Sequence, residues 1–160
     1  MPENEEIVIT TAEAMETLGS CLATCLEEVR LVSLRGALGA GKTTLVQGIL
    51  KGLGHTGSAK SPTFSLVEPY ELGGRAIFHF DLYRLKQPEE LEFMGIRDFF
   101  DQASLVLVEW PEKGAGVLPP ADADIILART QDGRSITWEA HTPAGKHAFT
   151  RFQAQCLNCS

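Results

Sequence analysis

The sequence has few of the features that mark membrane, fibrous or disordered proteins. Its unbroken apolar runs stop at four residues, as in Leu105–Val108, whereas a helix needs about 20 apolar residues to cross a bilayer. It shows no internal repeat or low-complexity segment, and 44% hydrophobic with 22% charged residues is typical of a globular domain. The acidic start, Met1–Glu6, does not resemble a secretory signal. We therefore expect one cytoplasmic domain over the 160 residues, without a membrane span.

Positive charge is also scarce. Fourteen lysines and arginines against 21 acidic residues give a net charge of −7, which repels a polyanion and disfavours direct, strong binding of DNA or tRNA.

Only four cysteines occur, at Cys21, Cys25, Cys156 and Cys159. Cys156 and Cys159 have zinc-ligand spacing, but a chain of this size needs neither a metal nor a disulfide to fold, and a cytosol keeps cysteines reduced. We interpret all four as thiols.

The hydrophobic pattern predicts strands and helices that alternate along the chain. One apolar stripe, from Met15 to Val29, predicts a long first helix, and the dipeptides Gly73-Gly74 and Asp132-Gly133 predict two β-hairpin turns. Leu105–Val108 is apolar on both faces, as in a central parallel strand. The predicted strands cover residues 6–10, 31–34, 63–70, 75–82, 105–108, 124–129 and 135–141, and further helices follow residues 41 and 87.

The strongest functional motif is Gly36–Thr43, a glycine, four residues and then Gly-Lys-Thr, which is the pattern of a phosphate-binding loop. Glycines let backbone N–H groups surround phosphate oxygens, Lys42 reaches the β- and γ-phosphates, and the Thr43 hydroxyl can bind Mg²⁺. The loop lies between a predicted strand and a predicted helix, as the motif requires. The predicted nucleotide-binding residues are Gly36, Ala37, Leu38, Gly39, Ala40, Gly41, Lys42, Thr43 and Thr44.

Two acidic residues are candidates for the second Mg²⁺ ligand. Asp81 and Glu109 each end a predicted strand, where ligands of open α/β sheets bind. The residues alone leave their roles interchangeable. His79, beside Asp81, is interpreted as a structural histidine rather than a catalytic base. In Ser61–Phe64 the Thr63 hydroxyl is a candidate γ-phosphate sensor, although a Ser-Pro-Thr turn is common and the motif alone is a weak indication.

Four ordered motifs resemble those of the TsaE family, also called YjeE. They are Gly36–Thr44, Ser61–Phe64, His79–Arg84 and Val108–Pro111. The resemblance extends from about Ile7 to His141, and residues 142–160 match nothing in the pattern. It implies a single-domain α/β fold of the P-loop NTPase type, with a mixed parallel and antiparallel sheet flanked by helices.

The resemblance also implies a function and assigns roles. It implies a Mg²⁺-dependent ATPase, required for threonylcarbamoyl-adenosine formation in tRNA, that acts with the TsaB and TsaD proteins and meets tRNA only indirectly. Lys42, Thr63 and Asp81 match the family's catalytic positions, with Asp81 in hydrolysis, and Thr43 and Glu109 match its metal ligands. Two alternatives stay open: a small-molecule kinase, and a module in which bound nucleotide orders the Ser61–Phe64 loop to present a surface.

Overall fold

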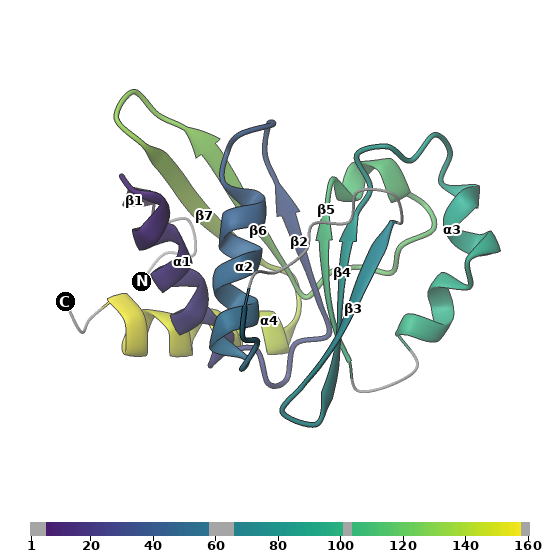
Figure 1. Ribbon diagram of the computed structural model, residues 1–160, viewed down its shortest axis with the longest axis horizontal. Helices are drawn as coiled ribbons and strands as arrows, with labels where there is room; N and C mark the ends of the chain where they lie inside the picture. Colours follow the sequence, from purple (N-terminus) through teal and green to yellow (C-terminus); the bar gives the residue numbers. More distant parts are fainter. Residues whose placement is uncertain (1–5, 58–65, 101–103, 158–160) are drawn as a thin grey trace.

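The computed structural model describes residues 6–57, 66–100 and 104–157, which form one seven-stranded sheet with helices on its two faces (Figure 1). The strands are ordered β1-β7-β6-β2-β5-β4-β3 across the sheet. Their bounds are β1 Ile7–Ile9, β2 Leu31–Arg35, β3 Val67–Leu72, β4 Arg75–Asp81, β5 Leu105–Glu109, β6 Ala123–Arg129 and β7 Arg134–Ala140.

The centre of the sheet is parallel and its edges are antiparallel. Strands β6, β2, β5 and β4 run in one direction, whereas β7 and β3 pair antiparallel with β6 and β4, and β1 pairs antiparallel with β7. The two antiparallel edges are the hairpins predicted from Gly73-Gly74 and Asp132-Gly133. Every residue of β5 is buried, as the apolar run predicted. The predicted α/β fold with a mixed sheet is therefore confirmed.

The helices divide between the two sheet faces. They are α1 Ala12–Ala23, α2 Lys42–Gly52, α3 Glu89–Phe93 and α4 Pro143–Phe152, with short turns η1 Ile96–Phe99, η2 Pro111–Gly114 and η3 Gln153–Leu157. One core combines α1, α2 and α4 with one face of the sheet, and a second core combines α3 and η1 with the other. None of the helices in these ranges has the length and apolar character of a membrane span.

The first helix is shorter than predicted. It ends at Ala23, and the Thr24 hydroxyl donates to the carbonyl oxygen of Cys21 at 2.8 Å as the chain leaves the helix. Leu26 and Val29, which belong to the same apolar stripe, are nevertheless fully buried in the connection to β2. The predicted burial of these residues was right and their helical conformation was wrong, because apolar side chains in a loop can enter the same core.

Helices α1 and α2 lie side by side at unusually close range (Figure 1). A Cβ atom placed on Gly19 would lie 2.6 Å from the carbonyl oxygen of Leu45, and one on Gly48 would meet the backbone of Glu16. The Ser20 hydroxyl donates to the carbonyl oxygen of Gly48 at 3.0 Å. Backbone contact of this kind holds the start of α1 in a defined position relative to the start of α2.

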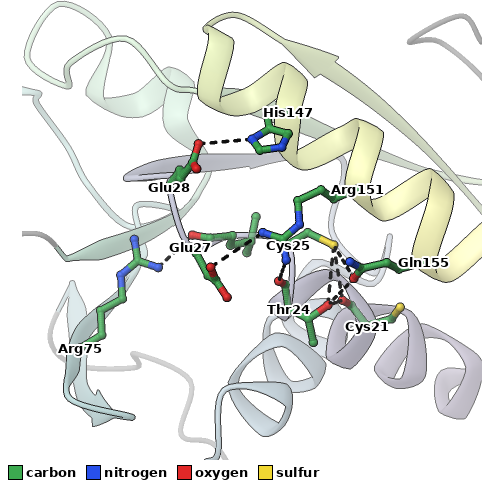
Figure 2. Close-up of polar contacts among 10 residues, drawn as sticks. Cys21, Thr24, Cys25, Glu27, Glu28, Arg75, His147, Arg151 and Gln155 are labelled. Atoms are coloured by element: carbon green, nitrogen blue, oxygen red, sulfur yellow. Dashed lines mark hydrogen bonds and ion pairs between the residues drawn. The ribbon is translucent and has the colours of Figure 1, made fainter.

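The C-terminal segment, which the sequence left unassigned, packs against the connection between α1 and β2. Thr142 caps the start of α4, and its hydroxyl accepts a hydrogen bond from the Gly145 N–H at 3.1 Å. Figure 2 shows Arg151 and Gln155 directed towards this connection. Arg151 Nη2 donates to the carbonyl oxygen of Thr24 at 3.1 Å, and Gln155 Oε1 lies 3.2 Å from the Thr24 hydroxyl oxygen.

This packing corrects the interpretation of the cysteines. Cys21 in α1 and Cys156 in η3 form a disulfide, with their Cα atoms 6.1 Å apart. The interpretation as thiols was wrong for this pair, because it rested on composition and could not show that α4 brings Cys156 to α1. Cys25 is a buried free thiol, and burial raises its pKa. Cys159 lies outside the described residues.

Candidate nucleotide-binding site

The phosphate-loop motif forms the connection between β2 and α2. Strand β2 ends at Arg35 and α2 begins at Lys42. Gly41 adopts a φ of 104°, in the left-handed region that glycine tolerates, and this turn directs the chain into the helix. The first N–H groups of α2 have no intrahelical partner, so the loop ends at a positively polarised helix terminus. This local geometry is that of an anion-binding loop.

A cavity of 380 Å³ opens at this loop. Among the predicted nucleotide-binding residues, those that line it are Leu38, Gly39, Gly41, Lys42, Thr43 and Thr44. Gly36, Ala37 and Ala40 belong to the same loop but do not line the cavity, and Ala40 is fully buried beneath it. Asp81 and Glu109 also line the cavity. The structure therefore brings the predicted loop and both predicted acids to one site.

The two acids lie opposite each other at the carboxyl ends of neighbouring strands. Asp81 pairs with Glu109 in the parallel register of β4 and β5. Glu109 is 2% exposed, and the Thr43 hydroxyl donates to its carboxylate, at 3.2 Å from Oε1 and 3.3 Å from Oε2. Glu109, and not Asp81, is thus the acid that contacts Thr43. Thr43 and Glu109 are the two residues that the resemblance matched to the family's metal ligands.

Asp81 has a different environment. It is half-buried, and its Oδ1 accepts a hydrogen bond from the backbone N–H of Tyr83 at 3.0 Å. Burial raises the pKa of Asp81 above its usual range, and the nearby Glu109 raises it further. The Tyr83 hydrogen bond and the neighbouring Lys42 act in the opposite direction. A carboxylate with a raised pKa is a better proton acceptor than an ordinary aspartate.

Lys42 is held inside the site by a carbonyl and an aromatic ring. Its Nζ donates to the carbonyl oxygen of Gly36 at 2.6 Å and lies 3.5 Å from the centre of the Trp110 ring. Burial lowers the pKa of Lys42, an effect that Glu109 opposes. Trp110 has a φ of 60°, which is rare for a bulky side chain and concentrates at functional sites.

Other lining residues were not predicted. Thr10, Thr11 and Met15, around the start of α1, form one wall of the cavity, and Arg134 at the start of β7 forms another part. Arg134 Nε donates to the carbonyl oxygen of Gly39 at 3.0 Å. Thr11 caps α1, and no local signal in the sequence placed it at the loop, because that position depends on the pairing of β1 with β7. Thr63 lies outside the described residues.

Known proteins that are similar to this chain share one description. A family model described as "Threonylcarbamoyl adenosine biosynthesis protein TsaE" matches residues 9–137. The protein named tRNA threonylcarbamoyladenosine biosynthesis protein TsaE from Haemophilus influenzae is 53% identical over 126 residues, covering 79% of this chain and 80% of that protein. The protein of the same name from Synechocystis is 40% identical over 118 residues, covering 71% and 74% of the two chains.

A solved structure extends the likeness to almost the whole fold. The crystal structure of YdiB from Bacillus subtilis matches with a TM-score of 0.81 and 25% sequence identity, covering 96% of this chain and 97% of that chain. The overlap includes the C-terminal segment that no sequence motif assigned.

Proposed function

Because the chain belongs to the TsaE family, as its four motifs indicated, we propose that it is a cytoplasmic, Mg²⁺-dependent ATPase that works with the TsaB and TsaD proteins. The family acts in the biosynthesis of threonylcarbamoyladenosine in tRNA. The observation that carries the proposal is the hydrogen bond from Thr43 to Glu109 beside Lys42, on the lining of a cavity bordered by a phosphate-binding loop.

The loop supplies the groups that bind phosphate. The N–H groups at the start of α2 donate to phosphate oxygens, and the helix dipole favours their negative charge. Lys42 already lies at the site, where its ammonium contacts the Gly36 carbonyl and the Trp110 ring. When the triphosphate binds, we expect Lys42 to exchange the carbonyl for the β- and γ-phosphate oxygens, because a charged acceptor makes the stronger hydrogen bond.

Thr43 and Glu109 fit a magnesium ion. Mg²⁺ prefers oxygen ligands and is usually held by one or two protein groups together with phosphates and water. The Thr43 hydroxyl and the Glu109 carboxylate are two such ligands, 3.2 Å apart at the start of α2. The bound ion would neutralise charge on the phosphates and so favour attack by water. Glu109 would hold the ion, and Lys42 would stabilise the charge that develops on the transferred group.

Asp81 is the residue best placed to act on water. It lines the cavity beside Glu109, its partner on the neighbouring strand. Its raised pKa favours acceptance of a proton or a hydrogen bond from the attacking water. Thr63 would contact the γ-phosphate from the Ser61–Phe64 segment and report its presence. With these groups the chain alone should hydrolyse ATP slowly, and TsaB and TsaD should stimulate it.

The net charge supports an indirect relation to tRNA. A chain with a net charge of −7 is poorly suited to bind a polyanion by itself. Binding to a protein partner does not require a positively charged surface on this chain. We therefore expect ATP hydrolysis to act on a protein partner that itself holds the tRNA.

Phosphate release from Mg²⁺-ATP tests the proposal. The purified chain is assayed alone and with TsaB and TsaD, with Lys42→Ala as the control, since loss of a transition-state hydrogen-bond donor typically costs about 10²- to 10³-fold. We expect slow release by the chain alone and strong stimulation by the partners, both absent from Lys42→Ala. Transfer of the γ-phosphoryl group to an acceptor other than water would show a kinase. Equal support of tRNA modification by a non-hydrolysable analogue would show a binding module.

A further inference from the structure

A buried histidine contacts the proposed metal ligand from inside the protein. His79 is 1% exposed, and its Nε2 lies 2.7 Å from Oε2 of Glu109, closer than the Thr43 hydroxyl lies to either oxygen of that carboxylate. The sequence pattern favoured a structural role for His79, and His79 has no part in the proposed binding of nucleotide or attack by water.

The sheet register explains how the two side chains meet. His79 pairs with Leu107, and Asp81 pairs with Glu109, in the parallel ladder of β4 and β5. Alternate residues of a strand share a face, so His79 and Glu109 lie on the same face, offset by two residues. This is the face covered by α1 and α2, where Ile77 and Leu107 belong to the core. His79 therefore reaches Glu109 from the core side, below the cavity.

Packing alone does not account for a histidine at this position. In the described part of the chain, His79 Nδ1 has no hydrogen-bond partner although it is buried. An unpartnered buried nitrogen is unfavourable, whereas Ile77, two residues earlier on the same face, is a fully buried apolar side chain. The single hydrogen bond to Glu109 is the interaction that an apolar residue would not provide.

The direction of this hydrogen bond follows from the chemistry of the carboxylate. A carboxylate that binds a metal ion is deprotonated and only accepts hydrogen bonds, so as a metal ligand Glu109 requires His79 to carry its proton on Nε2 and donate. Glu109 is then held between two donors, Thr43 from α2 and His79 from the core. A Thr43 hydroxyl that binds the ion through a lone pair keeps its O–H, but the direction of that O–H then depends on the ion. The hydrogen bond from His79 comes from the core side and does not depend on the ion.

We propose that His79 is a positioning residue for the magnesium site: its Nε2–H fixes the orientation of the Glu109 carboxylate, so that the other oxygen faces the bound ion. This inference rests on the proposed function, because it assigns a supporting contact within the same metal site. Groups that orient a metal ligand from behind commonly change metal affinity about 10- to 100-fold when they are removed.

Two substitutions at this position separate orientation from packing. In His79→Gln the amide nitrogen can donate from nearly the same place as Nε2, whereas His79→Met has similar length and no donor. Mn²⁺ is used as the probe, and its binding to the chain with ADP is measured by electron paramagnetic resonance. We expect His79→Met to bind Mn²⁺ about tenfold or more weakly and His79→Gln to stay within about threefold of the wild type.

ADP binding in the presence of a chelator is the control for folding and for the phosphate loop. Both variants should bind metal-free ADP as the wild type does, because the hydrogen bond of His79 is to Glu109 and not to the loop, and His79 does not line the cavity. Equal Mn²⁺ affinity of His79→Met and the wild type would overturn the inference. Equal weakening in both variants would also overturn it, since that result would show a requirement for the imidazole ring rather than for the donor.

A measurement on the unsubstituted chain does not depend on how the variants fold. Nitrogen-15 NMR of the His79 imidazole should show a proton on Nε2 and none on Nδ1. A proton on Nδ1 alone would refute the inference, because Nε2 could not then donate. The proposed function fails separately: if the wild type binds Mn²⁺-ADP in this way but releases no phosphate from ATP, the ATPase proposal is wrong and the role of His79 stands.

Discussion

Lys42 lies over the indole ring of Trp110, with its Nζ 3.5 Å from the ring centre. The two residues come from different elements, since Lys42 begins α2 and Trp110 follows β5. The Tyr83 ring packs against the Trp110 ring, with the two ring centres 5.1 Å apart. The cation that should bind phosphate is therefore held by an aromatic ring whose fluorescence can report on it.

Nucleotide binding should change the fluorescence of Trp110. When Lys42 turns towards phosphate, the ammonium leaves the indole face, so the emission of this ring should change in intensity or wavelength. The sequence has two tryptophans, and Trp138 is buried against Phe149, 5.6 Å between ring centres. Titration with ADP should give a signal in Trp138→Phe and none in Trp110→Phe. A signal that disappears in Trp138→Phe instead would contradict this arrangement.

The raised pKa of Asp81 predicts a dependence of stability on pH. The folded state holds its proton to higher pH than the unfolded chain does, so between the ordinary aspartate pKa, about 4, and the raised value the folded state binds more protons. The contribution of Asp81 to stability is therefore lost as pH rises through this window. Asp81→Asn should remove that loss, and its free energy of unfolding relative to the wild type should increase with pH across it.

Urea unfolding at a series of pH values measures this difference. The amide of Asp81→Asn keeps an oxygen that can accept from the Tyr83 N–H, so the substitution changes the charge while preserving the hydrogen bond. A constant difference between the two proteins at all pH values would mean that Asp81 titrates as an ordinary aspartate.

Some parts of the site could be predicted because they are local. Gly36–Thr43 needs only its own glycines and the following helix, so the motif defines the geometry of the loop. The choice between Asp81 and Glu109 as the partner of Thr43 could not be made in the same way. Both end neighbouring strands, and the structure distinguishes them through side-chain contacts across β4, β5 and α2.

The parts that were missed depend on contacts between distant segments. Arg134 donates to the Gly39 carbonyl although the two residues are 95 positions apart in the sequence. Met15 lines the cavity because α1 packs on α2. The C-terminal helix is an instructive case, since Thr142 followed by Pro143 is a recognisable helix start. Its position against the α1–β2 connection, and so the pairing of Cys156, followed only from the folded arrangement.

The close approach of α1 and α2 predicts a large effect of a single methyl group. In an exposed helix, replacement of glycine by alanine stabilises by about 1 kcal/mol. In Gly19→Ala the new Cβ would lie 2.6 Å from the carbonyl oxygen of Leu45, so the helices must separate and we expect a loss of about 1–3 kcal/mol. Because the start of α1 lines the cavity, ADP should also bind more weakly.

Thr17→Ala is the matched control for this change. Thr17 lies two residues away on the exposed side of α1 and donates only to the Glu13 carbonyl. Denaturant unfolding should show little change or a small gain for Thr17→Ala. A comparable gain in Gly19→Ala would be inconsistent with direct backbone contact between the helices.

The disulfide predicts a response to reductant. Cys21 and Cys156 are separated by 135 positions, so the bond closes a long loop and restricts the unfolded chain. Reduction should lower the free energy of unfolding by about 2–4 kcal/mol. It should leave ADP affinity nearly unchanged, because neither cysteine lines the cavity. Cys156→Ser should show the lower stability with or without reductant.

Cys25 provides the control for this experiment, because it is the neighbouring thiol on the same segment. Burial raises its pKa, which keeps little thiolate available, so Cys25 should react slowly with iodoacetamide in the folded chain. Cys25→Ala should keep the full response to reductant, since it leaves the Cys21–Cys156 pair intact. If the unsubstituted chain unfolds identically with and without reductant, while all its thiols react once it is unfolded, then Cys21 and Cys156 are thiols in solution. In that case α4 would be held in place by its non-covalent contacts, which include the hydrogen bonds of Arg151 and Gln155 and the packing of Phe149.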